Sequence, residues 1–362
     1  MERTILVVNS GSTSLKLTRV GQDGTRFPIS PGGRSASQLE ERLRRAGPVD
    51  AVAHRVVHGG VVHRGPERIT PRLLSELSRL APLAPLHQPR ALAAARAALG
   101  ALPGLPQVAC FDTAFHRTLP PAAATYAVPG SWRRRGAVRY GFHGLAHQYL
   151  ARRAAQMLGR PLTELSLVTC QLGGGASLAA VELGQSVDTT MGFTPLEGLP
   201  MASRSGSVDP GLITWAQRRL GLSGQEVEAQ LEHASGLKGL SGTPDMRRVL
   251  ALAQAGDSRA ELALEVYLHQ LARGIAAMTA SLSGLDAVVF GGGVGFGSPA
   301  VRAGAAQRLG VLGLQVDQAR NRDMSGDRRV EAAGSRCPVL TLETREELEM
   351  ARQTRELLGW DA

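Results

Sequence analysis

Residues Ile5 to Val20 read ILVVNSGSTSLKLTRV, and the interpretation of this stretch decides the fold. Four apolar residues lead into Asn9, small hydroxyl residues surround Gly11, and a second alternating run follows Lys16. The apolar runs predict two strands. The bend between them is typical of a hairpin, because glycine adopts the positive φ angles of tight turns, or of a phosphate loop, in which N–H groups and hydroxyls face an anion. Taken alone, the stretch favours the hairpin.

The same design recurs later in the chain. The segment LVTCQLGGGASLAAVELG begins at Leu167, and LDAVVFGGGVGFGSP, from Leu285, again joins an apolar strand to glycines. Two similar strand–bend–strand units, one in each half, predict two related domains facing each other, with the phosphates of one nucleotide between their bends. The repeat therefore shifts the interpretation of the opening stretch toward a phosphate loop.

Two common nucleotide motifs are absent from the sequence. No GxxxxGK[ST] string occurs, which excludes a Walker-type loop. The glycines at 291–297 do not match GxGxxG, so a dinucleotide-binding fold is poorly supported.

The chain has 362 residues, more than one hydrophobic core usually serves, so two domains are expected. Helical patterns at 90–102, 145–158 and 258–282 lie between strand-like runs, and this alternation predicts an α/β fold. The longest helix is expected to be capped by Asp257 or Ser258 and to stop at Gly284. The expected strands are Thr4–Val8, Leu15–Val20, Val49–Ala53, Gln107–Phe111, Leu165–Cys170, Ser177–Glu182, Ala287–Phe290 and Pro338–Leu342.

Composition argues against several classes of protein. The net charge of +10 comes almost entirely from scattered arginines, and aromatic residues make up only 4% of the chain, so nucleic-acid binding is not expected. No apolar stretch is long enough to span a membrane, and no signal peptide is recognised. The three cysteines have no metal-type spacing. Cys110 and Cys170 lie in apolar runs, and free thiols predict a cytoplasmic protein.

Four polar residues stand at the ends of predicted elements, where α/β proteins usually build their sites. They are Arg55 in HRVVHGG, Asp112 in FDTAFH, His143 in RYGFHG and Arg204 in SRSGSVDPG. Singly, each has an ordinary explanation: a surface ion pair, a helix cap, a core histidine or a charge beside a helix. Together with three glycine-rich bends they supply what phosphoryl transfer requires, namely cations for the phosphoryl oxygens, a carboxylate and an amide for magnesium, and backbone amides for the other phosphates.

Over nearly its whole length, the chain resembles the acetate kinase family, which belongs to the superfamily of actin and the sugar kinases. The resemblance runs through VVNSGSTSLK, HRVVHGG, LAPLHQP, FDTAFH, RYGFHG, DTTMGFTPLEG, RSGSVDPG, SGLKGLSGTPDMR and TREELEMARQT. It implies two duplicated actin/ribonuclease H-like α/β domains with a nucleotide cleft between them, and a homodimer. The implied domains are residues 1–148, completed by the C-terminal helix at 348–362, and residues 149–347.

The resemblance also implies roles for individual residues. Arg55 and Arg204 would hold the carboxylate and neutralise the transferring phosphoryl group, His143 would donate to its oxygens, and Asp112 would position the metal or the nucleophile. Asn9 and Glu346 would lie near Mg²⁺ or Mn²⁺. The apolar pocket for the acid would be formed by Val57, Leu86, Phe142 and Pro195. The nucleotide and its phosphates would be bound by Ser12, Ser14, Lys16, Gln171, Gly173, Gly174, Gly175, Asp245, Arg247, Gly291, Gly292, Gly293 and Gly295.

The chain departs from the family pattern near the nucleotide. Gln171 and Gly174 stand in QLGGG where the family has HLGNG, and Phe296 and Gly297 stand in GVGFG where it has GIGEN. Arg345 replaces an asparagine beside Glu346. A glutamine can donate a hydrogen bond to a phosphate but carries no charge.

The main functional prediction is reversible transfer of the γ-phosphoryl group of ATP to acetate, giving acetyl phosphate and ADP. Propionate or another small acid is the alternative within this class, because one methylene in an apolar pocket is worth only about 1–3 kcal/mol. A nucleotide-gated ATPase or binding protein on the same scaffold is the alternative from another class.

Overall fold

The computed structural model describes residues 3–10, 15–29, 36–85 and 87–360. The chain divides into two compact units. Unit 1 comprises Met1–Arg117, Phe142–Tyr149 and Arg345–Ala362, and unit 2 comprises Thr118–Gly141 and Leu150–Thr344. The domain limits drawn from the sequence stay a prediction; the units differ from them chiefly by including residues 118–141 in unit 2.

Unit 1 contains a six-stranded sheet in the order β3-β2-β1-β4-β6-β5. The strands are β1 (Ile5–Ser10), β2 (Leu15–Val20), β3 (Arg26–Ile29), β4 (Ala51–Val56), β5 (Glu67–Arg68) and β6 (Gln107–Phe111). Strands β1, β4 and β6 are parallel, and β2, β3 and β5 run antiparallel to their neighbours. The opening stretch therefore does form two antiparallel strands.

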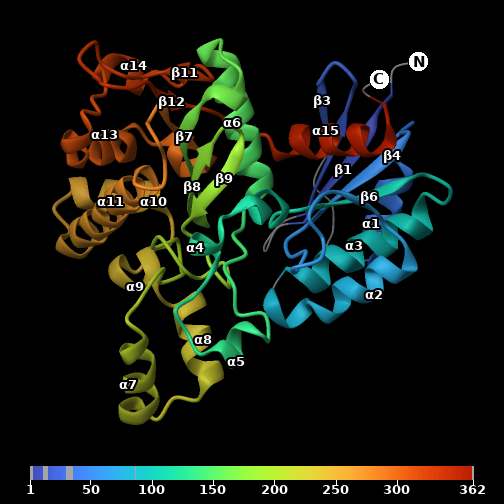
Figure 1. The fold of residues 1–362 in the computed structure, drawn as a ribbon, viewed down its shortest axis with the longest axis horizontal. Helices are drawn as coiled ribbons and strands as arrows, with labels where there is room; N and C mark the ends of the chain where they lie inside the picture. Colours follow the sequence, from blue (N-terminus) through green and yellow to red (C-terminus); the bar gives the residue numbers. More distant parts are fainter. Residues whose placement is uncertain (1–2, 11–14, 30–35, 86, 361–362) are drawn as a thin grey trace. The chain divides into compact units, whose positions relative to one another are not determined.

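Helices cover both faces of this sheet (Figure 1). They are α1 (Ala36–Arg44), α2 (Pro71–Arg79), α3 (Gln88–Ala101) and α15 (Glu346–Leu358), with 3₁₀ turns at Ala81–Leu83 and Ala114–Thr118. Because side chains alternate along a strand, Leu6 and Val8 pack toward α1 and α3, whereas Ile5 and Val7 pack toward α15. A parallel strand buried on both faces is apolar throughout, which explains why β1 could be recognised in the sequence.

Unit 2 repeats the topology of unit 1. Its sheet has the order β11-β12-β10-β7-β8-β9, with β7, β10 and β12 parallel and the others antiparallel to their neighbours. The strands are β7 (Ser166–Leu172), β8 (Ala176–Glu182), β9 (Gln185–Thr189), β10 (Ala287–Gly291), β11 (Arg328–Arg329) and β12 (Val339–Thr341). The duplication predicted from the repeated strand–bend–strand pattern is confirmed.

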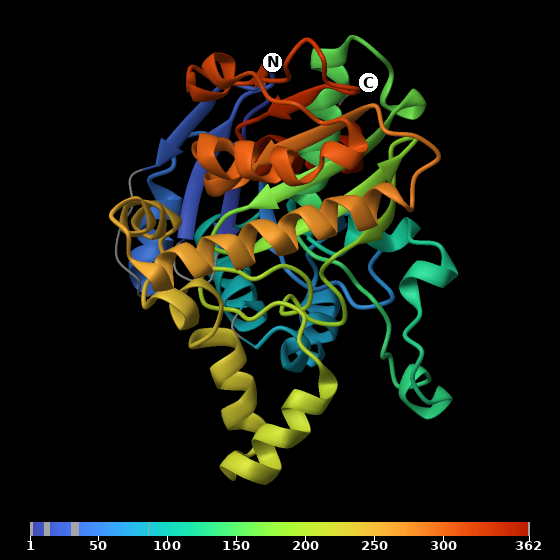
Figure 2. The same ribbon diagram turned by 90° about the vertical axis from the view of Figure 1, so that its left-hand side faces the viewer.

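The longest helix of unit 2, α11, lies along its sheet (Figure 2). It spans Ser258–Thr279, and the Asp257 side chain caps it by accepting a hydrogen bond from the Ala260 N–H at 2.9 Å. The prediction that it stops at Gly284 is wrong. The chain leaves the helix earlier, where Ser281 Oγ donates to Asp188 Oδ2 at 2.9 Å and Ser283 N donates to Glu182 Oε1 at 2.8 Å.

Among the remaining helices, α6 passes from unit 1 into unit 2 at Tyr149–Leu150, and the others belong to unit 2. The remaining helices are α4 (Pro121–Ala124), α5 (Gly130–Arg133), α6 (Gly144–Leu158), α7 (Pro210–Leu220), α8 (Gly224–His233), α9 (Gly236–Ser241), α10 (Met246–Gln254), α12 (Gly292–Gly297), α13 (Pro299–Arg308) and α14 (Gln318–Arg322), with 3₁₀ turns at Leu162–Glu164 and Gly310–Leu312.

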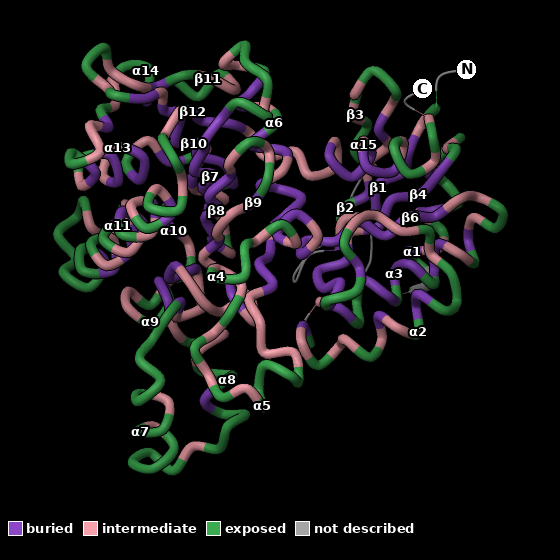
Figure 3. Tube along the Cα trace, viewed as in Figure 1, coloured by how far each residue is buried: buried purple, intermediate pink, exposed green. Residues whose placement is uncertain are grey.

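Burial follows this architecture (Figure 3). The central strands are buried, whereas α7 has no buried residue. Cys110 in β6 and Cys170 in β7 are buried free thiols, as their apolar runs predicted. Among the described helices, none is long and apolar enough to cross a membrane.

Candidate active site

A cluster of polar side chains lies at one edge of the unit 1 sheet. Asn9 is near the end of β1, Arg55 is near the end of β4, and Asp112 directly follows β6. These three strands are parallel neighbours, with Val8 opposite His54 and Val56 opposite Phe111. Their carboxyl ends therefore meet, which is where open α/β sheets place ligands.

Arg55 and Asp112 form a two-pronged ion pair. Arg55 Nη2 donates to Asp112 Oδ2 at 2.7 Å, and Arg55 Nε lies 3.1 Å from both carboxylate oxygens. The Asp112 side chain is 1% exposed and that of Arg55 is 14% exposed. A planar guanidinium that faces a carboxylate in this way is fixed in orientation as well as in charge.

Asn9 and Glu346 complete the cluster. Glu346, the first residue of α15, accepts a hydrogen bond from Asn9 Nδ2 at 2.8 Å, and its Oε2 lies 3.4 Å from Arg55 Nη1. Arg55 Nη1 also donates to Asn9 Oδ1 at 3.3 Å. The structure thus brings together one cation, two carboxylates and an amide from four separate parts of unit 1.

The charges in this cluster shift one another's ionisation. Burial raises the pKa of Asp112 to about 6, and Glu346 adds to the rise, while Arg55 offsets part of it. Burial alone would lower the pKa of Arg55, but the charges of Asp112 and Glu346 outweigh it, so that pKa lies above its ordinary value. Arg55 therefore stays charged while Asp112 gains its proton in mildly acidic solution.

This order of ionisation predicts a pH dependence. As the pH falls through about 6, Asp112 is protonated and its ion pair with Arg55 is lost, so kcat/KM should fall. The check is the pH profile of kcat/KM for the carboxylate substrate from about pH 5 to about pH 8. Asp112→Asn, which has no proton to gain, should lose this acid limb at lower activity. A limb that persists in the asparagine variant would assign it to another group.

Helix α6 begins in contact with this cluster. Gly144 N donates to the Asp112 carbonyl at 2.8 Å, and a Cβ at Gly144 would lie 2.2 Å from that oxygen, so no other residue fits there without a shift. The preceding residue, His143, has a φ of 56°, which is a left-handed backbone conformation that residues other than glycine rarely adopt. Such strain persists only where the surroundings enforce it, and it is common at functional sites.

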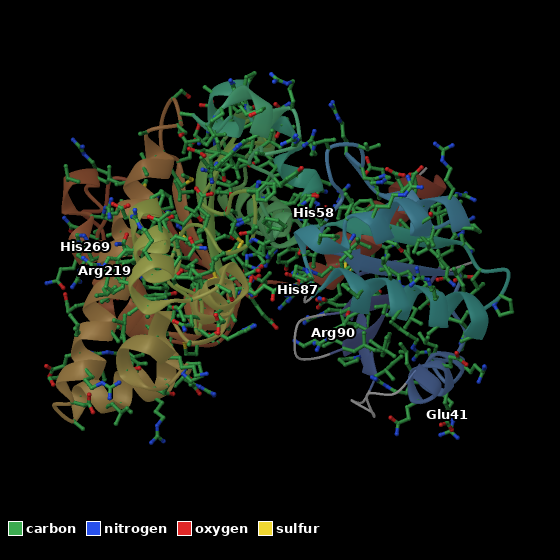
Figure 4. All side chains as sticks on the ribbon, turned by 90° about the horizontal axis from the view of Figure 1, so that it is seen from below. Glu41, His58, His87, Arg90, Arg219 and His269 are labelled. Carbon is green, nitrogen blue, oxygen red and sulfur yellow. The ribbon has the colours of Figure 1, made fainter. Side chains whose placement is uncertain are left out.

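The apolar residues predicted for the substrate pocket of unit 1 are buried beside this turn. Phe142 is 1% exposed and Val57 is 5% exposed. The ring of His58 meets the Phe142 ring edge to face, with 5.6 Å between the ring centroids. In Figure 4, His58 lies among packed side chains, whereas Glu41 lies at the periphery of the molecule. The Phe142 carbonyl lies 3.0 Å from His116 Nε2, which fixes the backbone just before His143.

Three predicted site residues, Ser12, Ser14 and Leu86, lie outside the described residues. Lys16 is exposed on β2, directly opposite Asn9 in the strand register. Lys16 therefore stands beside the polar cluster at the same edge of the sheet.

Arg204 lies in unit 2, in a loop ahead of α7. Its Nη1 donates to the Pro195 carbonyl at 3.0 Å and lies 3.5 Å from Met201 Sδ. Among the described ion pairs, none includes Arg204, and burial lowers its pKa while the charge of Glu232 opposes this. A partly buried guanidinium without a carboxylate partner is well suited to receive an anion.

The loop that carries Arg204 is held by a glycine. Gly236 has φ 60°, and a Cβ there would lie 2.5 Å from the Arg204 carbonyl. Leu237 N donates to the Met201 carbonyl at 2.9 Å, and Met201 N donates to the Arg204 carbonyl at 3.0 Å.

The glycine-rich bends of unit 2 lie side by side at the end of its sheet. Gln171 on β7 is opposite Gly291 on β10. Thr344 connects them, because its Oγ1 donates to Gln171 Oε1 at 2.8 Å and accepts from Gly292 N at 2.9 Å. Gly292 has φ 74°, and a Cβ there would lie 2.4 Å from the Leu172 carbonyl, so this close approach of backbones requires glycine.

The other residues of unit 2 that were predicted to bind the nucleotide lie in the glycine turns, in α12 and at the start of α10. Gly173 N donates to the Gly175 carbonyl at 2.8 Å, which closes a tight turn, and space is open at Gly174 and Gly293. Gly295 is buried in α12. Asp245 and Arg247 pair with each other at the start of α10, where Arg247 Nη2 lies 2.7 Å from Asp245 Oδ2.

The donor set at the unit 1 cluster fits a hard divalent cation. Carboxylate and amide oxygens are the ligands that Mg²⁺ prefers, and Mg²⁺ usually takes only one or two protein carboxylates, the rest coming from water and phosphates. Asn9, Asp112 and Glu346 supply such oxygens within one cluster. In the described parts of the chain, no group of three or more His, Cys, Asp or Glu side chains is arranged to hold a metal ion.

The sequence did not point to several residues that hold the predicted site residues or their loops in place. Gly144 fixes the Asp112 carbonyl, Thr344 joins two glycine bends, and Tyr126 binds Glu197 and Phe193 in the loop that carries Pro195. Gly144, Glu197 and Thr344 are within strings that the resemblance covered, but no local pattern marks a residue whose partner is far away in sequence. Nothing in the sequence around Tyr126 indicated its contacts.

Comparisons with known proteins agree on one family. The model of the Acetokinase family matches residues 35–352. An acetate kinase from Synechococcus sp. is 50% identical over 317 residues, 87% of this chain and 78% of that protein. The crystal structure of an acetate kinase from Porphyromonas gingivalis superposes with a TM-score of 0.89 at 31% identity, covering 98% of this chain and 100% of that chain. A propionate kinase from Francisella tularensis gives a TM-score of 0.88 at 32% identity, covering 97% and 98%.

Proposed function

The chain belongs to the acetokinase family, as its sequence predicted, and from this premise we propose that it transfers the γ-phosphoryl group of ATP reversibly to acetate, giving acetyl phosphate and ADP. It is a phosphotransferase with a carboxyl group as acceptor, built on two duplicated α/β domains of the actin-like fold.

The observation that carries the proposal is the cluster at the edge of the unit 1 sheet. Arg55 is held by Asp112 and Glu346, with Asn9 beside it. A carboxylate substrate is already an anionic nucleophile at neutral pH, so no general base is needed. The chemical task is to bring two anions together in line and to spread the charge that develops on the transferring group. A fixed guanidinium does both.

We propose that Arg55 binds the carboxylate and the phosphoryl oxygens, and that Asp112 orients Arg55. His143, in its strained turn, donates to the transferring group, and Arg204 contributes a second positive charge to it. Val57 and Phe142, and with them Pro195 and Leu86, are the apolar residues that we propose for the alkyl end of the acid.

A divalent cation fits the oxygen donors of the same cluster. We propose that Asn9 and Glu346 hold Mg²⁺ or Mn²⁺, with Asp112 close by. When bound, the cation would neutralise charge on the nucleotide phosphates. The chain's own part is to keep Glu346 in place through Asn9 Nδ2, which donates to Glu346 Oε2 at 2.8 Å.

The glycine bends of unit 2 are proposed to receive the nucleotide phosphates. Backbone N–H groups in such concave bends bind anions. Gln171, Gly173–Gly175 and Gly291–Gly293 with Gly295 would form this part of the site. Lys16, with Ser12 and Ser14 outside the described residues, would supply the corresponding phosphate contacts from unit 1. Asp245 and Arg247 would flank the base.

Propionate is the second candidate substrate, because the propionate kinase from Francisella tularensis is as similar in fold as the acetate kinases. One methylene is worth only about 1–3 kcal/mol in an apolar pocket. Hydroxylamine trapping of the acyl phosphate across a panel of short carboxylates would rank these acids. We expect acetate to give the highest kcat/KM. ATP hydrolysis at a rate that no carboxylate changes would favour an ATPase and contradict the proposal.

We also propose that the protein is a homodimer in the cytoplasm that binds neither nucleic acid nor membranes. The buried free thiols Cys110, Cys170 and Cys337 support a reducing compartment. Sedimentation velocity would test the dimer.

A further inference from the structure

The loop between β9 and α7 in unit 2 carries both Pro195 and Arg204, and a group of side chains outside it holds its first part. Tyr126 and Arg139 come from the segment 118–141, and Glu197 comes from the loop itself. We call these three residues the loop cluster.

Arg139 binds the carbonyls at the start of the loop. Its Nη1 lies 3.3, 3.4 and 3.3 Å from the carbonyls of Thr189, Thr190 and Met191. Its Nη2 donates to Glu197 Oε1 at 2.8 Å, and its guanidinium lies over the Tyr126 ring at 5.2 Å from the centroid. Arg139 therefore links three successive carbonyls at the start of the loop to the Glu197 carboxylate farther along the same loop.

Tyr126 closes the other side of the loop. Its hydroxyl donates to Glu197 Oε2 and accepts from Phe193 N at 2.8 Å. A Cβ at Gly192 would lie 1.7 Å from Glu197 Oε2 and 2.0 Å from the Tyr126 hydroxyl, so these side chains fill the space that a glycine leaves. The path from residue 191 to residue 197 is thus fixed at both ends and in its middle.

Arg204 is bound to this fixed path through Pro195. Pro195 lies between Phe193 and Glu197, and its carbonyl accepts the Arg204 Nη1 hydrogen bond at 3.0 Å. Because no described ion pair includes Arg204, this carbonyl is the strongest hydrogen-bonding group that orients its guanidinium. The contrast is Arg55, which a carboxylate orients directly.

We propose that the loop cluster is a positioning device for Arg204: Tyr126 and Arg139, acting through Glu197, place the Pro195 carbonyl, and this carbonyl aims the guanidinium at its anion. The inference rests on the proposed function, because it assumes that Arg204 acts on the transferring phosphoryl group. None of the three cluster residues is a catalytic residue in this scheme.

A double-mutant cycle tests the proposal. Tyr126→Phe keeps the ring and removes only the hydroxyl, so kcat/KM for the carboxylate should fall about tenfold, the loss expected for one or two buried hydrogen bonds. In the Arg204→Ala background the same change should alter kcat/KM by less than about twofold, because the group it positions is gone. The KM for ATP should be unchanged in both backgrounds.

Tyr140→Phe is the matched control. It removes a tyrosine hydroxyl of the same segment that donates to the Gly136 carbonyl at 3.0 Å, and it keeps the Tyr140 ring beside Phe193 and the backbone hydrogen bond to Gly192. Its kcat/KM should stay near that of the wild type. Glu197→Gln is the second test variant, used if Tyr126→Phe does not fold, and it should show the same dependence on Arg204.

Equal losses from Tyr126→Phe in both backgrounds would overturn the inference and leave the proposed function intact. A near-normal Arg204→Ala enzyme would overturn the role of Arg204 and the inference with it. Dependence on Arg204, with unchanged thermal unfolding of Tyr126→Phe, would support the inference.

Discussion

Replacing Arg55 by alanine is expected to lower kcat by about 10³-fold or more, the effect that a charge-stabilising arginine has in phosphoryl transfer. Arg55 is the cation of the unit 1 cluster, fixed by Asp112 at 2.7 Å and by Asn9 at 3.3 Å. A guanidinium already held in place needs no reorganisation as charge develops on the reacting group. Acyl phosphate formation under saturating ATP and carboxylate measures the effect.

Arg55→Ala should also lower the unfolding temperature. It leaves the Asp112 carboxylate, 1% exposed, without its cation and close to Glu346. Breaking a buried pair by removing one partner costs about 3–5 kcal/mol. Activity should therefore be measured well below the unfolding transition of the variant.

Arg26→Ala is the matched control for Arg55. Arg26 pairs with Glu347 at 2.7 Å, so it also contacts the first turn of α15, but it is 31% exposed and lies outside the cluster. Its loss should change kcat less than about twofold, because partly exposed ion pairs contribute little. Arg55→Ala activity within about tenfold of the wild type would contradict the role assigned to Arg55.

The parts of the fold that sequence could predict are those whose environment is local. Strands β1, β4, β6, β7, β8, β10 and β12 were each expected to within a few residues, because strands buried on both faces read as continuous apolar runs. Strand β2 was expected at its observed bounds, Leu15–Val20, from its alternating pattern. Strands β3, β5, β9 and β11 were not expected. Strand β5 consists only of Glu67 and Arg68, and its existence depends on pairing with β6 rather than on any pattern of its own.

The candidate site follows the same division. Arg55 and Asp112 could be selected because each is a polar residue at the end of an apolar run, and the structure joins them. Glu346 could not, since it meets Asn9 across 337 residues of sequence, and only the family resemblance suggested it. Likewise, no local pattern encodes the left-handed φ of His143 or the packing of Gly144 against the Asp112 carbonyl, which is distant in sequence.

Replacing Arg204 by alanine is expected to lower kcat by about 10³-fold or more while leaving the unfolding temperature unchanged or higher. The structural reason is that, among the described residues, the Arg204 guanidinium bonds to the Pro195 carbonyl and Met201 Sδ rather than to a carboxylate, and that burial lowers its pKa more than the charge of Glu232 raises it. A charge kept from water without a counter-ion costs stability, so its removal should not destabilise the fold. This separates Arg204 from Arg55, whose removal is expected to harm both activity and stability.

The measurements are kcat in both directions and thermal unfolding of the same samples. Arg160→Ala is the control in unit 2, since Arg160 pairs with Asp286 at 2.6 Å at a partly exposed position, and its kcat should be close to the wild-type value. Arg204→Lys should recover part of the activity, because it keeps the charge but not the guanidinium geometry. If Arg204→Ala were as destabilised as Arg55→Ala, the guanidinium would be a structural element, and its role as a second cation for the phosphoryl group would be wrong.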